Sequence, residues 1–198
     1  MRHLATAVML LVLLGGTGGV ALAGPLDAPG ATKAITCSAC HGVQGASPST
    51  AMPSLAGMWP VYFKKAITDF AEGKRPSTEM EPYAKMVMQM GVDELAAYFS
   101  AQPRTATAIA VDPAAVARGQ AAAGPCLGCH HAGGTTIGPA IIPDLRGQPP
   151  GYLLNQMVLF KQNKRSPGDP NLTSVKAMMN GIPDATLGDL AAYFSSLK

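Results

Sequence analysis

Aromatic side chains are scarce in this sequence, and its positive charges do not gather into a patch. Phe, Trp and Tyr make up 6% of the 198 residues, and the 15 Lys and Arg residues are scattered along the chain. Proteins that bind nucleic acids usually combine a basic patch or stripe with a recognisable binding motif. We therefore predict no nucleic-acid partner.

Convincing strand patterns are also missing. No segment alternates apolar and polar residues as a half-buried strand does, and the chain instead resembles helices separated by long Gly- and Pro-rich loops. The pattern predicts helices over 62–72, 92–101, 152–163 and 185–197, together with a short helix at each of two cysteine motifs. The sequence therefore predicts an all-α fold.

A hydrophobic run long enough to span a membrane is absent as well. The apolar stretch Leu4–Val12 is followed by Gly15, Gly16, Gly18 and Gly19, and falls short of the ~20 apolar residues that a transmembrane helix needs. A positive start, this short apolar core and Ala21-Leu22-Ala23 are the three parts of a secretory signal peptide. We predict a signal peptide at 1–23 and export to the periplasm, with a retained anchor as the alternative.

Cysteine is rare, and its four copies stand in one repeated pattern, Cys37-Ser38-Ala39-Cys40-His41 and Cys126-Leu127-Gly128-Cys129-His130. Cys-x-x-Cys-His is typical of covalent c-type haem attachment. Cysteines three residues apart on a helical turn project to the same side, so that each sulfur can form a thioether with one haem vinyl group. The histidine that follows is placed to ligate the iron through a neutral imidazole. The sequence thus predicts two c-type haems, attached through Cys37, Cys40, Cys126 and Cys129 and ligated by His41 and His130.

Other uses of paired cysteines fit less well. Zinc ribbons separate their Cys pairs by about 15–20 residues, whereas roughly 85 residues lie between Cys40 and Cys126. A thioredoxin-like redox pair needs a βαβ context that the sequence lacks. Ordinary disulfides would leave both histidines unexplained. Haem attachment alone accounts for the whole pattern.

The two motifs belong to an internal repeat. The segment Tyr62 to Arg75 recurs as Tyr152 to Arg165, and Leu95–Ser100 recurs almost unchanged as Leu190–Ser195. Repeats of about 20–50 residues indicate solenoids, whereas a period of roughly 90 residues with one haem motif per copy indicates tandem domains. We predict one domain over 24–103, a linker over 104–112 that is rich in Ala and Thr, and a second domain over 113–198.

The mature chain resembles the class I diheme cytochromes c typified by cytochrome c4. The resemblance rests on both haem motifs, the Tyr…Phe…Lys-Arg segment, a Met-x-Pro loop and the closing Leu-Ala-Ala-Tyr-Phe helix. It implies two tandem class I cytochrome c domains, each wrapped around one covalent haem, in an electron carrier that is not itself an enzyme. In this family a distal methionine stands fifteen residues before the leucine of the closing motif. That position is Met80, which the resemblance makes the sixth ligand of the first haem iron.

The second half departs from this family pattern. Val175 holds the position that corresponds to Met80, and a longer loop precedes it. We predict Met178 as the sixth ligand of the second iron, with Met179, an unusual ligand and an open site as the alternatives. Pro139 resembles the loop proline whose carbonyl orients the proximal imidazole, and its counterpart in the first half is left open between Pro48 and its neighbours.

The resemblance implies a periplasmic protein that shuttles single electrons between respiratory redox partners. The expected donor is a dehydrogenase or a quinol oxidase, and the expected acceptor is a terminal oxidase or reductase. Peripheral association with a membrane is left open. Two alternatives stand beside this function: a diheme subunit of a flavocytochrome c sulfide dehydrogenase-like complex, and a diheme oxidoreductase with a reactive second haem.

Overall fold

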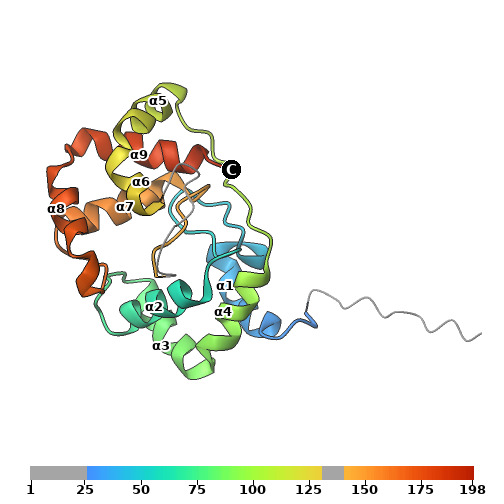
Figure 1. Ribbon diagram of the computed structural model, residues 1–198. Coiled ribbons are helices and arrows are strands. Elements are labelled where there is room, and N and C mark those ends of the chain that lie inside the picture. The colour runs from blue at the N-terminus through green and yellow to red at the C-terminus, as the bar shows by residue number, and fades with distance from the viewer. Residues whose placement is uncertain (1–25, 131–140) are drawn as a thin grey trace, which may run out of the picture.

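A computed structural model describes residues 26–130 and 141–198, and all regular secondary structure within these ranges is helical (Figure 1). The first half contains α1 (Ala31–His41), η1 (Val43–Gly45), α2 (Pro60–Ala71), α3 (Met80–Met90) and α4 (Val92–Ala101). The second contains α5 (Pro113–Ala122), η2 (Gly124–Cys126), α6 (Leu127–His130), α7 (Pro150–Lys161), η3 (Pro170–Leu172), α8 (Ser174–Gly181) and α9 (Asp184–Ser196). The predicted all-α fold is confirmed.

The predicted signal peptide (1–23) and Pro139 lie outside the described residues. No helix in the described part of the chain has both the length and the apolar character needed to cross a bilayer.

Four of the predicted helices correspond to α2, α4, α7 and α9, with limits that differ by at most two residues. Both α2 and α7 begin with a proline, Pro60 and Pro150. Proline suits the first turn of a helix because its missing N–H would have no partner there. Three helices were not predicted: α3, α5 and α8.

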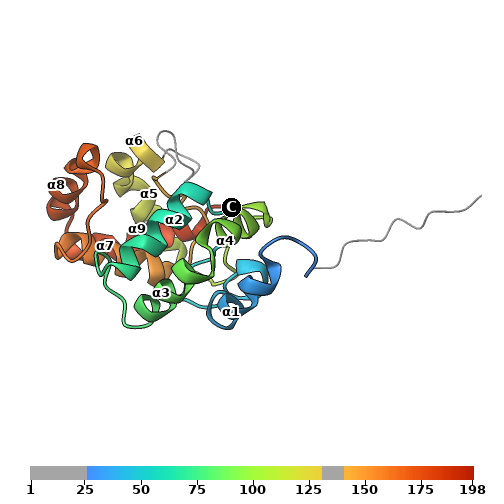
Figure 2. The same ribbon diagram turned by 90° about the horizontal axis from the view of Figure 1, so that it is seen from below.

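The internal repeat is visible in the packing. In the first half α1 packs against α4 and α2 packs against α3 and α4, while in the second half α5 packs along α9 and α7 packs against α8 and α9. The blue-to-green first half and the yellow-to-red second half lie side by side, joined by the non-helical stretch 103–112 (Figures 1 and 2). Each half therefore repeats the contact of its first helix with its last.

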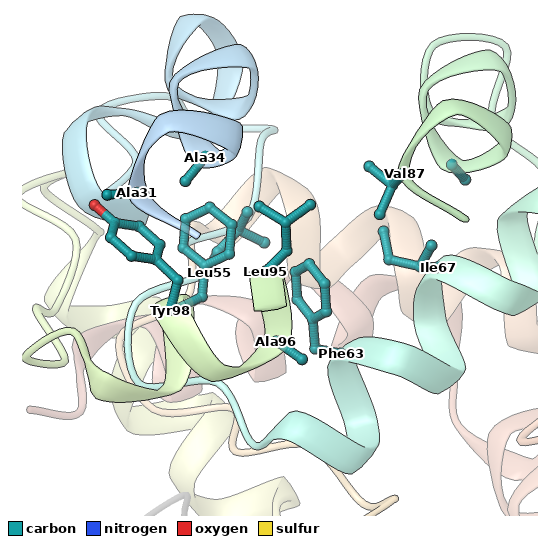
Figure 3. Close-up of a cluster of buried hydrophobic side chains, with 11 residues drawn as sticks. Ala31, Ala34, Leu55, Phe63, Ile67, Val87, Leu95, Ala96 and Tyr98 are labelled. Atoms are coloured by element: carbon teal, nitrogen blue, oxygen red, sulfur yellow. The ribbon is translucent and has the colours of Figure 1, made fainter. Parts of the chain in front are cut away.

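Each half has its own hydrophobic core. In the first half Phe63 and Ile67 of α2 belong to one cluster with Leu95 of α4 (Figure 3). Phe99 of α4 belongs to the same cluster, with its ring centroid 5.7 Å from that of Phe63. In the second half the core comprises Ala123, Cys126, Leu153, Leu190, Ala191, Tyr193 and Phe194. Because Cys126 belongs to this cluster, the second cysteine motif is in contact with the core of its half.

Glycine lets the first and last helices of each half approach closely. A Cβ atom on Gly30, just before α1, would lie 2.6 Å from the backbone oxygen of Glu94 in α4. At the corresponding place in the second half, a Cβ on Gly119 of α5 would lie 2.0 Å from the backbone oxygen of Asp189 in α9. In both cases the added Cβ would clash with a backbone oxygen of the last helix, and backbone atoms cannot shift without a large energetic cost. These two positions therefore need glycine.

We expect Gly119→Ala to lower the free energy of unfolding by about 1–3 kcal/mol, the usual cost of forcing an extra methyl group into a packed contact. Gly188→Ala is the matched control on α9, because a Cβ there would meet no atom within 4 Å. Chemical denaturation of the haem-loaded proteins compares the two. Equal stability of the two variants would contradict the proposed close contact between α5 and α9.

Candidate haem-binding sites

The last turn of α1 presents Cys37, Cys40 and His41. Neither cysteine forms a disulfide bond; Cys37 is partly buried and Cys40 is exposed. Burial raises the pKa of the Cys37 thiol, which keeps it protonated near neutral pH. Two unpaired thiols three residues apart on one helix are what attachment to two vinyl groups requires.

The imidazole of His41 is buried and held in a defined orientation. Its Nδ1 lies 2.8 Å from the carbonyl oxygen of Pro53, and since a carbonyl only accepts, Nδ1 donates. This fixes the tautomer with the lone pair on Nε2, the atom left for a metal. Burial lowers the pKa of His41, which favours the neutral form that ligates iron.

The second half repeats this arrangement. Cys126 ends η2, while Cys129 and His130 lie in α6. His130 donates from Nδ1 to the carbonyl oxygen of Pro143 across 2.8 Å, and burial lowers its pKa as well. In both halves the structure brings the predicted cysteines and histidine of the motif together, and in both the histidine Nδ1 donates to a proline carbonyl oxygen.

The prediction that Pro139 orients the proximal imidazole is wrong. The acceptor is Pro143 in the second half and Pro53, not Pro48, in the first. A sequence signal for both exists: each proline begins a Pro-x-Leu-x-Gly segment, Pro53–Gly57 and Pro143–Gly147. The glycine of each segment then donates its N–H to the carbonyl oxygen of Phe99 or Phe194 in the closing helix. The loop is thereby fastened to the core with its proline carbonyl near the histidine.

A large cavity opens in the second half between the cysteine motif and α8. Cys126, Cys129 and His130 line it together with Val175, Met178 and Met179, and its empty space measures about 1310 Å³ including the part open to solvent. Apolar side chains make up much of the remaining wall, among them Ile142, Leu145, Leu153, Met157 and Phe194. A large, mostly apolar group that is tethered by two sulfurs and ligated by an imidazole fits this cavity.

The wall formed by α8 carries the candidate sixth ligands. Three residues of α8 line the cavity: Val175, which cannot ligate iron, and Met178 and Met179, which follow about one helical turn later. Met179 is buried, with 4% of its surface exposed, whereas Met178 is half-buried. The structure therefore brings both predicted methionines to the cavity and favours neither by position alone.

Met80 is the first residue of α3 in the first half. Its backbone N–H donates to Ser77 Oγ across 3.1 Å, which satisfies one of the unpaired groups at the helix start. The side chain is half-buried and packs against the same core cluster as Cys37. Met80 and the first cysteine motif thus share one apolar cluster.

The cysteine pairs of the two halves belong to separate sites. Within the described ranges, no three His, Cys, Asp or Glu side chains come together as they do in a zinc site. The first half nevertheless contributes to the second cavity, because Met58, Trp59 and Tyr62 line part of its wall.

The chain is similar in sequence to known cytochromes c. The family model described as Cytochrome c matches residues 116–198. Cytochrome c4 of Pseudomonas aeruginosa is 33% identical over 96% of this chain and 97% of its own length. The thiosulfate dehydrogenase electron acceptor of Stutzerimonas stutzeri is 30% identical over 83% of this chain and 80% of its own length.

A solved structure extends the similarity to the fold. Reduced recombinant cytochrome c4 from Pseudomonas stutzeri matches with a TM-score of 0.72 and 27% sequence identity, covering 84% of this chain and 96% of that chain. The helical halves, the two Cys-x-x-Cys-His motifs and a relative aligned along nearly the whole chain all agree. The chain therefore belongs to the cytochrome c4 family, and it is a diheme c-type cytochrome that binds two haems covalently and carries electrons.

Proposed function

We propose that this cytochrome works in the periplasm and passes single electrons from a dehydrogenase or quinol oxidase to a terminal oxidase or reductase. The bound haems supply reversible one-electron chemistry, and the chain holds, orients and shields them. The observation that carries the proposal is the second cavity, where the cysteines and His130 face α8 across a largely apolar interior. Its apolar lining would hold the haem while offering no acid, base or nucleophile for substrate chemistry, as a protein that only carries electrons requires.

The axial ligands follow from the same proposal. His41 and Met80 would hold the first iron, and His130 together with Met178 or Met179 would hold the second. A thioether ligand raises the reduction potential because the soft sulfur favours ferrous iron. With both positions filled, neither iron would offer a site to an external substrate. The alternative of a reactive second haem requires that neither methionine reaches the iron.

We further propose that the two haems define two domains, 24–103 and 113–198, joined by the linker 104–112. Separate hydrophobic clusters in the two halves and the non-helical stretch 103–112 support this division. The N-terminal segment 1–23 would direct export and be removed. Mass spectrometry of the periplasmic fraction is expected to find a mature chain that begins near Gly24, and recovery only from the cytoplasm would contradict the location.

The name of one relative suggests a specific donor. Because this chain resembles a thiosulfate dehydrogenase electron acceptor along most of its length, we propose that a sulfur-compound dehydrogenase is among its donors. This role is close to the alternative of an electron-transfer subunit in a sulfide dehydrogenase-like complex. In both cases the catalytic step belongs to the partner, and this chain only accepts the electrons.

Stopped-flow spectroscopy tests the carrier function. Oxidised protein mixed with a thiosulfate dehydrogenase and thiosulfate is expected to become reduced at both haems, and to stay oxidised when either component is left out. Reduction by thiosulfate without the dehydrogenase would make this chain the enzyme and contradict the proposal. A lack of reduction in the complete mixture would exclude this donor, and a quinol oxidase assay would then test the other donor class.

A further inference from the structure

One glutamine joins the two proline loops that orient the histidines. Gln148 directly follows the Pro143–Gly147 segment of the second half. Its side chain nevertheless binds Ser54 of the first half, the residue after Pro53: Ser54 N–H donates to Gln148 Oε1 across 3.0 Å, and Gln148 Nε2 donates to the carbonyl oxygen of Ser54 across 2.9 Å. Both residues are buried, Gln148 with 5% and Ser54 with 4% of its surface exposed. The amide thus occupies both backbone hydrogen-bonding groups of one residue across the boundary between the halves.

The N–H of Ser54 and the carbonyl of Pro53 belong to the same peptide group. No cis peptide bond occurs in the described part of the chain, so within this planar group the N–H and the C=O point in opposite directions. The carbonyl oxygen accepts from His41 Nδ1 across 2.8 Å on one side, and the N–H donates to Gln148 on the other. A continuous series of hydrogen bonds therefore runs from the amide of the second half to the proximal histidine of the first.

The direction of every bond in this series is fixed. A backbone N–H only donates and a backbone carbonyl only accepts, so the amide oxygen of Gln148 faces the N–H of Ser54 and the amide nitrogen faces its carbonyl. Hydrogen bonds in series polarise one another, which makes the Pro53 carbonyl a stronger acceptor. A stronger acceptor at Nδ1 raises the basicity of the imidazole of His41, and a more basic imidazole favours ferric iron.

The second half also supports the loop that contains Pro53 at a second point. The backbone N–H of Tyr152, in the first turn of α7, donates to the carbonyl oxygen of Thr50 across 3.0 Å. A Cβ atom on Gly151 would lie 2.8 Å from that same oxygen, so this close approach needs glycine. The stretch 148–152 of the second half therefore holds this loop of the first half at both Thr50 and Ser54.

The arrangement is not reciprocal. Matching the two Pro-x-Leu-x-Gly segments places Met58 of the first half at the position of Gln148. A thioether has no N–H to donate and accepts only weakly, so Met58 cannot hold a peptide group of the second half as the amide of Gln148 holds Ser54. A change at Gln148 should therefore act more strongly on the first iron than on the second.

We propose that Gln148 is a positioning residue for the first haem: through this side chain the second half holds the Pro53 carbonyl against His41 and thereby sets the reduction potential of the first iron. Without the amide, the N–H and C=O of Ser54 would be buried without partners, which is costly. The loop would shift to reach other partners, and the Pro53 carbonyl would move with it. The proposal needs the covalent haems but neither the location nor the electron donors proposed above, so its failure would leave those proposals intact.

Redox titration of the haem-loaded Gln148→Met variant, with the two haems distinguished by their NMR signals, tests the proposal. Methionine is similar in size and stands at the corresponding position of the first half. A weaker hydrogen bond to His41 makes the imidazole less basic, so the potential of the first haem is expected to rise. We expect its ferrous-to-ferric ratio at a fixed ambient potential to increase about threefold, which is about 28 mV at 59 mV per tenfold change for a one-electron couple. No rise at the first haem, or an equal rise at the second, would overturn the proposal.

Solvent exchange of the histidine Nδ1–H protons gives a second readout that does not depend on the potentials. Proton NMR of the reduced protein follows the exchange at His41 and His130 separately. In Gln148→Met the His41 proton is expected to exchange faster than in the wild type, whereas the His130 proton keeps its rate. An unchanged rate at His41 would contradict the proposed hold on its hydrogen bond.

Three further variants separate the hydrogen bonds from packing. Gln148→Glu keeps an oxygen that accepts from Ser54 and is expected to show no rise, whereas a rise equal to that of Gln148→Met would attribute the effect to packing and overturn the proposal. Gln102→Met removes a glutamine that donates to the carbonyl oxygen of Tyr98 across 2.9 Å within the first half. It is expected to shift neither potential, and a rise at the first haem as large as in Gln148→Met would contradict a specific role of Gln148. If Gln148→Met yields no haem-loaded protein, Gln148→Asn carries the test, because its amide is one methylene shorter: faster exchange at His41 supports the proposal, and an unchanged rate contradicts it.

Discussion

Replacing Cys126 and Cys129 together by alanine is expected to remove one of the two haems and to unfold most of the second half. Cys126 belongs to the core cluster of that half, and it also lines the large cavity beside that cluster. A small helical unit buries too little apolar surface to be stable with such a cavity empty. Haem content and helical circular dichroism of the purified variant measure both effects.

The matching change at Cys37 and Cys40 serves as the control. It is expected to remove the first haem and to leave the second in place, so that each double variant keeps about half of the haem absorbance. If the Cys126 and Cys129 variant kept both haems covalently bound, the proposed attachment site of the second haem would be wrong. If it kept one haem and lost no helix, the haem would not be the element that stabilises this half.

Replacing Met80 by alanine is expected to lower the potential of the first haem strongly, by roughly a few tenths of a volt, because axial ligands set haem potentials over a span of about 0.8 V. Without the thioether, water or an external ligand can reach the iron. We therefore expect the reduced variant to bind carbon monoxide and to lose half of the weak far-red absorption of methionine-ligated ferric haem. Redox titration and absorption spectroscopy measure these changes.

Met178→Ala and Met179→Ala extend the same test to the second haem. One of the two is expected to lose the other half of the far-red absorption, while its neighbour keeps it. A full far-red signal in Met80→Ala would show that the first iron has another ligand. No loss in either α8 variant, combined with carbon monoxide binding by the wild-type protein, would show an open second iron and revive the oxidoreductase alternative.

The haem motifs and the repeat were predictable because each residue pattern carries its own chemistry. Cys-x-x-Cys-His needs only a helical turn to bring its sulfurs to one side, and this local requirement is met in both halves. The four matched helices also follow from local signals, such as the proline that begins α2 and the one that begins α7. Such patterns can be recognised in the sequence because they depend on neighbouring residues and not on tertiary contacts.

The missed helices show where local signals were misread. Pro82 suggested a loop, but it is the third residue of α3, where its missing N–H costs nothing because the first four N–H groups of a helix have no partner within it. The helix α5 begins directly after the predicted linker 104–112, where Asp112 accepts from the N–H of Ala114 and Pro113 follows it directly. Asp112 at the N-cap and Pro113 at the first helical position are both sequence signals of a helix N-terminus.

Contacts between the halves could not be predicted from either half alone. Each copy of the repeat contains a tyrosine and an arginine at matching positions, Tyr62 and Arg75 in the first and Tyr152 and Arg165 in the second. Each tyrosine hydroxyl nevertheless accepts a hydrogen bond from the arginine of the other copy. Likewise, only a comparison of the two copies singles out Pro53 and Pro143 as the prolines that orient the histidines. The tyrosine–arginine pairings depend on how the two copies lie against each other, which no single segment encodes.

The most direct measurement is the intact mass of the purified, exported protein under denaturing conditions. Thioether bonds survive denaturation, so we expect a single species whose mass exceeds that of the mature polypeptide by two haems. A mass equal to the bare polypeptide, with the pigment released into acidified acetone, would contradict covalent attachment at both cysteine motifs.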